Sequence, residues 1–112
     1  MSKYMQLTVT VRPFYEREMK IVYPKLVRFL RQADPRLLDR DPSLYELAGQ
    51  LDSLLYRSDG TSLRAVLLRQ GDKLRSTHKK VQENIADRNL AQADKLLYIL
   101  EDIFDEIESD LD

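Results

Sequence analysis

The chain lacks cysteine and tryptophan, and its 112 residues include one histidine and three glycines. Without cysteine there is no disulfide framework, no thiolate metal site and no cysteine nucleophile, a composition that fits the cytoplasm. Histidine is common in catalytic centres and glycine in phosphate-binding loops, so the scarcity of both makes such sites unexpected here. We therefore expect a cytoplasmic protein that is not an enzyme and has no cofactor or metal site.

Long apolar runs are absent as well. No stretch approaches the roughly 20 apolar residues that span a bilayer, and the first residues lack the basic and apolar segments of a signal peptide. A length of 112 residues fits one domain. We expect a soluble, unprocessed protein with a single helical domain over 1–112 and no membrane partner.

Charge is nearly balanced overall but divided along the chain. The net charge is -1, yet residues 1–32 carry seven basic and two acidic side chains, and residues 89–112 carry one and eight. Residues 61–88 are basic and 33–60 are acidic. This alternation favours antiparallel helices of complementary charge, although each surface pair contributes only about 0 to 1 kcal/mol.

The clearest pattern predicts a helix over 90–111. Its apolar residues alternate steps of three and four, which places them on one face: Leu90, Ala93, Leu97, Leu100, Phe104, Ile107 and Leu111. Leu96, Ile99 and Ile103 widen this face to that of a helix packed on several neighbours. After Lys95 the remaining surface carries only acidic charge.

Similar stripes predict three earlier helices, over 13–33, 42–57 and 61–87. Pro24 interrupts the first, and since the stripe keeps its phase we expect one helix kinked near Pro24 rather than a restart. The second has two alternative starts, Asp41 before Pro42 or Ser43 with Glu46. The four predicted helices give an all-α, antiparallel up-down four-helix bundle.

Smaller signals refine this fold. Thr61 or Ser62 is expected to cap the third helix, and Gly71 could break it. Because the apolar phases of the third and fourth helices do not join, we predict a tight turn at 87–89 with Asn89 as the next cap. Gly49 could mark a close approach of another helix.

The N-terminal arm has a different pattern. Leu7, Val9 and Val11 alternate with Thr8 and Thr10, as in a β-strand, but no second strand-like run exists. The segment is therefore either the first turns of a helix or an extended arm. An arm could pair with its copy in a dimer or add to the sheet edge of a partner.

His78 lies on or near the apolar stripe of the third predicted helix. Histidine phosphotransfer domains are also four-helix bundles, but their motif has a lysine three residues after the histidine, where this chain has Val81. A phosphotransfer role for His78 is thus a remote alternative to a packed histidine.

The basic third helix offers another alternative, a nucleic-acid-associated regulator. Its cationic side chains could contact phosphates if they shared one exposed face: Arg64, Arg69, Lys73, Arg75, Lys79 and Lys80. Acidic residues elsewhere in the chain balance this charge, so a nucleic-acid partner is not our main expectation.

The main functional prediction is a non-enzymatic protein-interaction module, such as an adaptor, small chaperone or regulatory subunit. Its partner would be another protein or a second copy in a homodimer. The predicted contact residues are the acidic end of the last helix and the apolar arm: Glu106, Glu108, Asp110, Leu7, Val9 and Val11.

Overall fold

The computed structural model describes residues 4–5, 8–13 and 19–112. These residues contain helices and no strand, which confirms the all-α prediction. The helices within this part of the chain are α1 (Met19–Val22), α2 (Pro24–Ala33), α3 (Leu44–Gly49), α4 (Leu51–Arg57), α5 (Ser62–Ala86) and α6 (Leu90–Asp110). No helix among them is long and apolar enough to cross a membrane.

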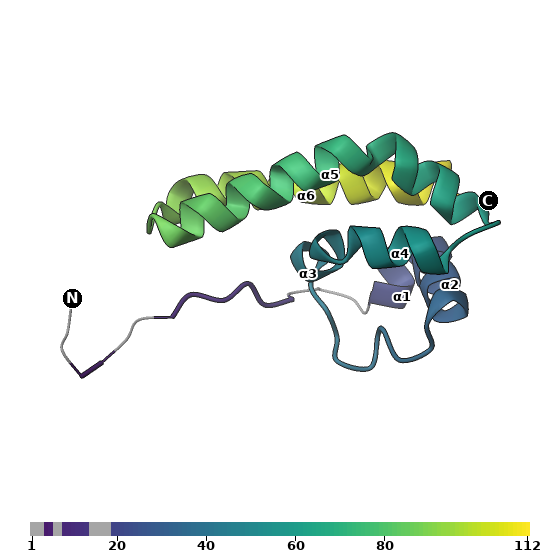
Figure 1. Cartoon of the computed structure of the whole chain (residues 1–112), viewed down its shortest axis with the longest axis horizontal. Helices are drawn as coiled ribbons and strands as arrows, with labels where there is room; N and C mark the ends of the chain where they lie inside the picture. The colour runs from purple at the N-terminus through teal and green to yellow at the C-terminus, as the bar shows by residue number, and fades with distance from the viewer. Residues whose placement is uncertain (1–3, 6–7, 14–18) are drawn as a thin grey trace.

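A long hairpin of α5 and α6 dominates the molecule (Figure 1). Its turn uses Arg88 at φ 61°, and the Asn89 N–H donates to the Asn84 carbonyl at 2.8 Å. The predicted turn at 87–89 is confirmed, but Asn89 makes no side-chain cap bond. Gly71 does not break α5, because buried packing on both sides holds the 25-residue helix together.

The first predicted helix restarts instead of bending. Tyr23 has φ -126° and ψ 63°, so α1 ends before it, and Pro24 opens α2 at the first helical position, where a missing N–H costs no hydrogen bond. Pro13 lies in a non-helical segment, and residues 14–18 lie outside the described part. The kinked helix over 13–33 is therefore wrong in form, because the backbone leaves the helical region at Tyr23.

The second predicted helix is also divided, at Gln50 between α3 and α4. Ser43 caps α3 by accepting the Glu46 N–H at 3.1 Å, so the second of the two predicted starts is the one observed. Gly49 ends α3, consistent with the low helix propensity of glycine.

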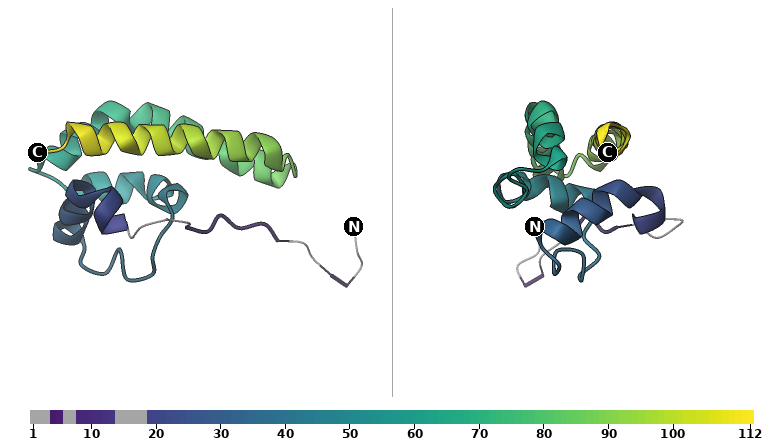
Figure 2. Two further views of the ribbon diagram at one scale, coloured as in Figure 1. Left: turned by 180° about the vertical axis from the view of Figure 1, so that it is seen from behind. Right: turned by 90° about the vertical axis from the view of Figure 1, so that its right-hand side faces the viewer.

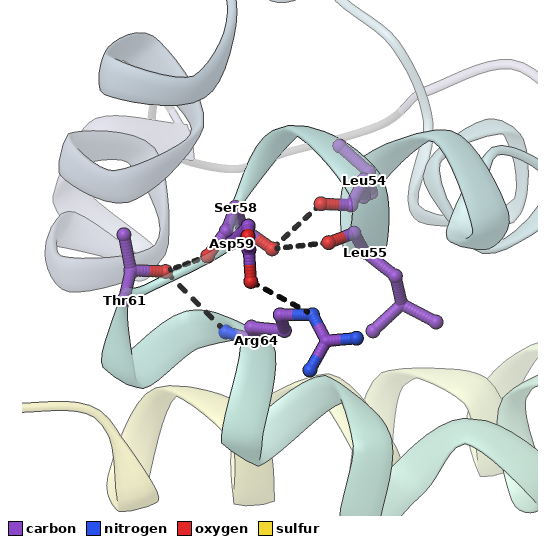
Figure 3. Close-up of polar contacts among 6 residues, drawn as sticks. All are labelled: Leu54, Leu55, Ser58, Asp59, Thr61 and Arg64. Carbon is purple, nitrogen blue, oxygen red and sulfur yellow. Dashed lines mark hydrogen bonds and ion pairs between the residues drawn. The ribbon is translucent and has the colours of Figure 1, made fainter.

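The turn from α4 to α5 is built from side-chain hydrogen bonds (Figure 3). Ser58 is buried and its hydroxyl donates to the Leu54 carbonyl at 2.6 Å, while the Thr61 hydroxyl donates to the Ser58 carbonyl. Thr61 also accepts the Arg64 N–H, which confirms Thr61 as the cap of α5. Gly60 has φ +79°, a left-handed conformation that glycine adopts without strain.

The helices form two layers, with the short helices α1 to α4 beneath one end of the hairpin (Figure 2). The other end of the hairpin, with its turn, extends past α3. The described residues do not confirm the predicted four-helix up-down bundle, because two of the predicted helices are broken into short pieces. The principal extents are 50 × 27 × 26 Å, and the radius of gyration is 15.0 Å, above the about 13 Å of a compact chain of this length.

One apolar core joins the two layers. Its most deeply buried side chains come from α2, α3, α5 and α6: Leu26, Leu30, Leu47, Leu63, Leu67, Leu74, Leu100 and Ile107. Burying each of these side chains contributes about 1.5 to 3 kcal/mol. The core therefore anchors the C-terminal half of α6.

Candidate interaction surfaces

Glu108 caps helix α2 from a distant part of the chain. Its carboxylate accepts the backbone N–H groups of Lys25 at 3.1 Å and Leu26 at 2.9 Å. These groups belong to the first turn of α2, whose own N-cap residue, Tyr23, makes no side-chain cap bond. A carboxylate at a helix N-terminus satisfies unpaired donors and interacts favourably with the helix dipole.

The other predicted acidic residues also have internal contacts. Glu106 accepts a hydrogen bond from the Gln70 side chain at 2.9 Å, and Asp110 lies 4.0 Å from Arg69. Half of the Asp110 side chain stays exposed. The role of Glu106, Glu108 and Asp110 in binding a partner stays a prediction, whereas their contacts within the chain are structural.

Basic residues of α2 hold the C-terminal backbone. Lys25 Nζ donates to the Leu111 carbonyl at 3.1 Å, and Arg28 Nη2 donates to the Asp112 carbonyl at 2.8 Å. Tyr23 adds a hydrogen bond to Asp105 at 2.8 Å. The charge pattern of the sequence indicated this pairing of basic first and acidic last segments. The specific capping role of Glu108 was missed, although Pro24 without a capping residue before it was a usable signal.

The arm is extended where it is described. Val9 and Val11 are half-buried, while Thr8, Thr10 and Arg12 are exposed. Burial therefore alternates from residue to residue, as the sequence pattern predicted. Of the two alternatives for the arm, residues 8–13 take the extended one. Leu7 lies outside the described residues.

A groove of about 230 Å³ lies between the arm, the start of α3 and α6. We call it the arm–α6 groove. Its α6 side is formed by Asp94, Leu97, Tyr98, Leu100 and Glu101. The arm and α3 contribute Val11, Arg12, Pro13, Ser43, Leu44 and Tyr45. The sequence pattern had identified the arm and α6 separately, but nothing in it indicated that they meet here.

The electrostatics of this groove are acidic on the α6 side. Partial burial raises the pKa of Glu101, and the negative charges of Asp105, Asp102 and Asp94 raise it further. Because these neighbours disfavour the charged form of Glu101, a positively charged group placed beside Glu101 would be stabilised there. Tyr98, 63% exposed, stands beside them with most of its ring in solvent.

His78 packs at the contact between α5 and α3. Its ring stacks on Tyr45 with centroids 4.4 Å apart, and a Cβ added to Gly49 would lie 2.8 Å from His78 Nε2. The predicted close approach at Gly49 is therefore confirmed, with the imidazole as the approaching group. Burial lowers the pKa of His78 and raises that of Tyr45. This setting is that of a packed histidine at the edge of the core.

The basic residues of α5 are partly paired with acidic ones. Arg64, Arg69 and Arg75 lie within 4.0 Å of Asp59, Asp110 and Asp52, respectively. Lys73 and Lys80 line a shallow groove that Asp102 and Glu106 of α6 also line. Carboxylates beside these cations reduce the positive potential that phosphates need, so this face gives no support to the nucleic-acid alternative.

Within the described residues, no three His, Asp or Glu side chains are grouped so that they could hold a metal ion. Comparison with known proteins gives no relative: no family model, curated protein or solved structure matches this chain.

Proposed function

We propose that this protein is a non-enzymatic protein-interaction module, such as an adaptor, small chaperone or regulatory subunit, that binds its partner in the arm–α6 groove. The main support for this proposal is the arm–α6 groove, where half-buried Leu97, exposed Tyr98 and the carboxylates of Asp94 and Glu101 meet, with Arg12 of the arm also in the lining. Exposed tyrosines next to apolar pockets are frequent energetic centres of protein interfaces.

The groove chemistry indicates what kind of segment it would accept. Half-buried Leu97 supplies apolar contact, while Asp94 and Glu101 supply negative charge on the same helix. A partner segment with an apolar side chain and a nearby lysine or arginine would match both. Binding would bury Leu97 and stabilise the charged form of Glu101.

The acidic end of α6 has a different part in this proposal. Glu108 stabilises α2, and Glu106 and Asp110 contact α5, so these residues hold the C-terminal half of α6 against its neighbours. Glu106 and Asp110 remain exposed and could extend a partner contact as a secondary surface. Homodimerisation would be a second use of the arm.

The test compares two exposed tyrosines. Affinity purification of the wild-type chain from its source cell would identify co-purifying proteins, and Tyr98→Ser should lose them. Tyr56→Ser is the matched control, because Tyr56 is 86% exposed on α4 and does not line the groove. Both variants should keep the helical circular dichroism spectrum.

Three outcomes would contradict the proposal. Recovery of no partner by the wild-type chain would oppose a protein-interaction function. Equal recovery by wild type and Tyr98→Ser, or equal loss in both tyrosine variants, would oppose the groove as the binding site.

A further inference from the structure

The described part of the arm has a row of unused backbone hydrogen-bonding groups. Residues 8–13 are extended, and no hydrogen bond of any of them occurs in the described structure. Extended segments with unpaired N–H and C=O groups are templates for pairing with another strand. The side chains already alternate as in a strand that has one covered face, with Val9 and Val11 turned inward.

We propose that the arms of two copies of this protein pair as antiparallel strands around a twofold axis at Thr10. In this register Thr10 faces Thr10 of the second copy, Val9 faces Val11, and Thr8 faces Arg12. Pro13, which has no N–H, falls outside the ladder. The pairing concerns a second copy and does not depend on the arm–α6 groove binding another protein.

The side chains match in this register. The paired valines share one face and the threonines the other, so the half-buried face remains apolar along both strands. Cross-strand pairs between β-branched residues contribute about 0.2 to 1 kcal/mol each. A shift by one residue would place valine opposite threonine and mix the two faces.

Charge and access also favour a second copy. Arg12 is the one charged residue between 8 and 13. In the proposed register the two arginines lie at opposite ends of the ladder, about 14 Å apart along the strand, so their repulsion is screened. The described part of the arm runs from beside α3 toward the end of the molecule where the α5–α6 turn lies (Figure 1). Thr8 and Thr10 are exposed, so a second strand could reach them.

The absence of cysteine allows a clean crosslinking test in the full chain. Thr10→Cys should form a disulfide-linked dimer under mild oxidation, because facing strand residues lie within the about 7 Å Cα distance that a disulfide spans. Thr8→Cys and Arg12→Cys should not crosslink alone, since each is four residues from its copy. A mixture of these two variants should crosslink as a heterodimer.

Ser53→Cys is the control for crosslinking by random collision, because Ser53 is exposed and lies on α4, away from the arm. Sedimentation of the wild-type chain should give twice its 13.2 kDa mass, and Val9→Asp, which places charge on the apolar face, should return it to a monomer.

Thr10→Cys that crosslinks no faster than Ser53→Cys would overturn the pairing. Equal crosslinking at 8, 10 and 12 would overturn the antiparallel arrangement, and a maximum elsewhere would overturn the register. None of these results bears on partner recovery by Tyr98→Ser.

Discussion

The two halves of α6 share one apolar repeat but differ in what surrounds them. In the C-terminal half Phe104 and Ile107 are buried, and Glu108 is engaged by the first turn of α2. In the N-terminal half Ala93 and Leu96 are also buried, but Leu90, Tyr98 and Ile99 are each about half exposed or more. One amphipathic helix can therefore be a structural element at one end and present exposed apolar side chains at the other, depending on where its neighbours stop.

The largest expected effect is a difference in the free energy of unfolding between alanine substitutions of two isoleucines in α6. Ile107 is fully buried, so Ile107→Ala should lower the free energy of unfolding by about 2 to 5 kcal/mol, because it removes apolar contacts and leaves a cavity. Ile99 is 48% exposed, and Ile99→Ala should cost less than about 0.5 kcal/mol. Urea unfolding measures both. Equal costs would contradict the division of α6 into two halves.

The next effect concerns the acidic residues of the same helix. Glu108→Ala should destabilise the fold by about 0.5 to 2 kcal/mol, since two N–H groups of α2 lose their acceptor. Glu101→Ala is the control on the groove side and should not destabilise, because its carboxylate is opposed by its neighbours. Thermal unfolding distinguishes them. A stable Glu108→Ala would show that the cap is not needed.

A smaller effect is expected where α3 meets α5. Gly49→Ala should destabilise by about 1 kcal/mol, because the new Cβ displaces the His78 ring from Tyr45 and this outweighs the better helix propensity of alanine. In Gly71→Ala the nearest atom is a flexible Arg75 nitrogen at 3.3 Å, so this control should be neutral or stabilising. In the His78→Ala background the Gly49→Ala penalty should vanish, and its persistence would contradict the close approach.

The smallest effect is a pH dependence of stability. Burial lowers the pKa of folded His78, so the unfolded chain binds this proton more tightly. Its contribution to stability should be complete above the ordinary pKa of 6.5 and should decline as the pH falls below 6.5 toward the lowered pKa of the folded state. His78→Phe keeps an aromatic ring and should flatten this part of the curve. A slope that is unchanged in His78→Phe would assign it to other groups.

Local patterns predicted helices where the chain carries strong periodicity and caps. The α5–α6 hairpin could be predicted because the apolar positions of the two helices do not continue one heptad repeat. The caps at Ser43 and Thr61 could be predicted because their hydroxyl groups accept backbone N–H groups at helix starts. Pro24 indicated an interruption of the first helix, but the apolar residues keep their helical spacing across Tyr23 and across Gln50, so neither the restart at Tyr23 nor the break at Gln50 was predicted.

The candidate site was harder to predict because it depends on tertiary contacts. The acidic C-terminal residues appeared available in the sequence, yet the N–H groups that engage Glu108 lie 82 and 83 residues away. Val11 and Tyr98 likewise belong to one groove only after the chain folds. Charge segregation indicated the pairing of segments but not which carboxylates remain free.

Recovery of partner proteins by Tyr98→Ser and Glu108→Ala, measured beside their thermal stability, tests the division of α6 most directly. We predict that Tyr98→Ser keeps wild-type stability and loses the partner, whereas Glu108→Ala melts at a lower temperature but still recovers the partner below that temperature. The reverse result, a folded Glu108→Ala without partner and a Tyr98→Ser with it, would place the interaction surface at the acidic end of α6 and contradict the proposed groove.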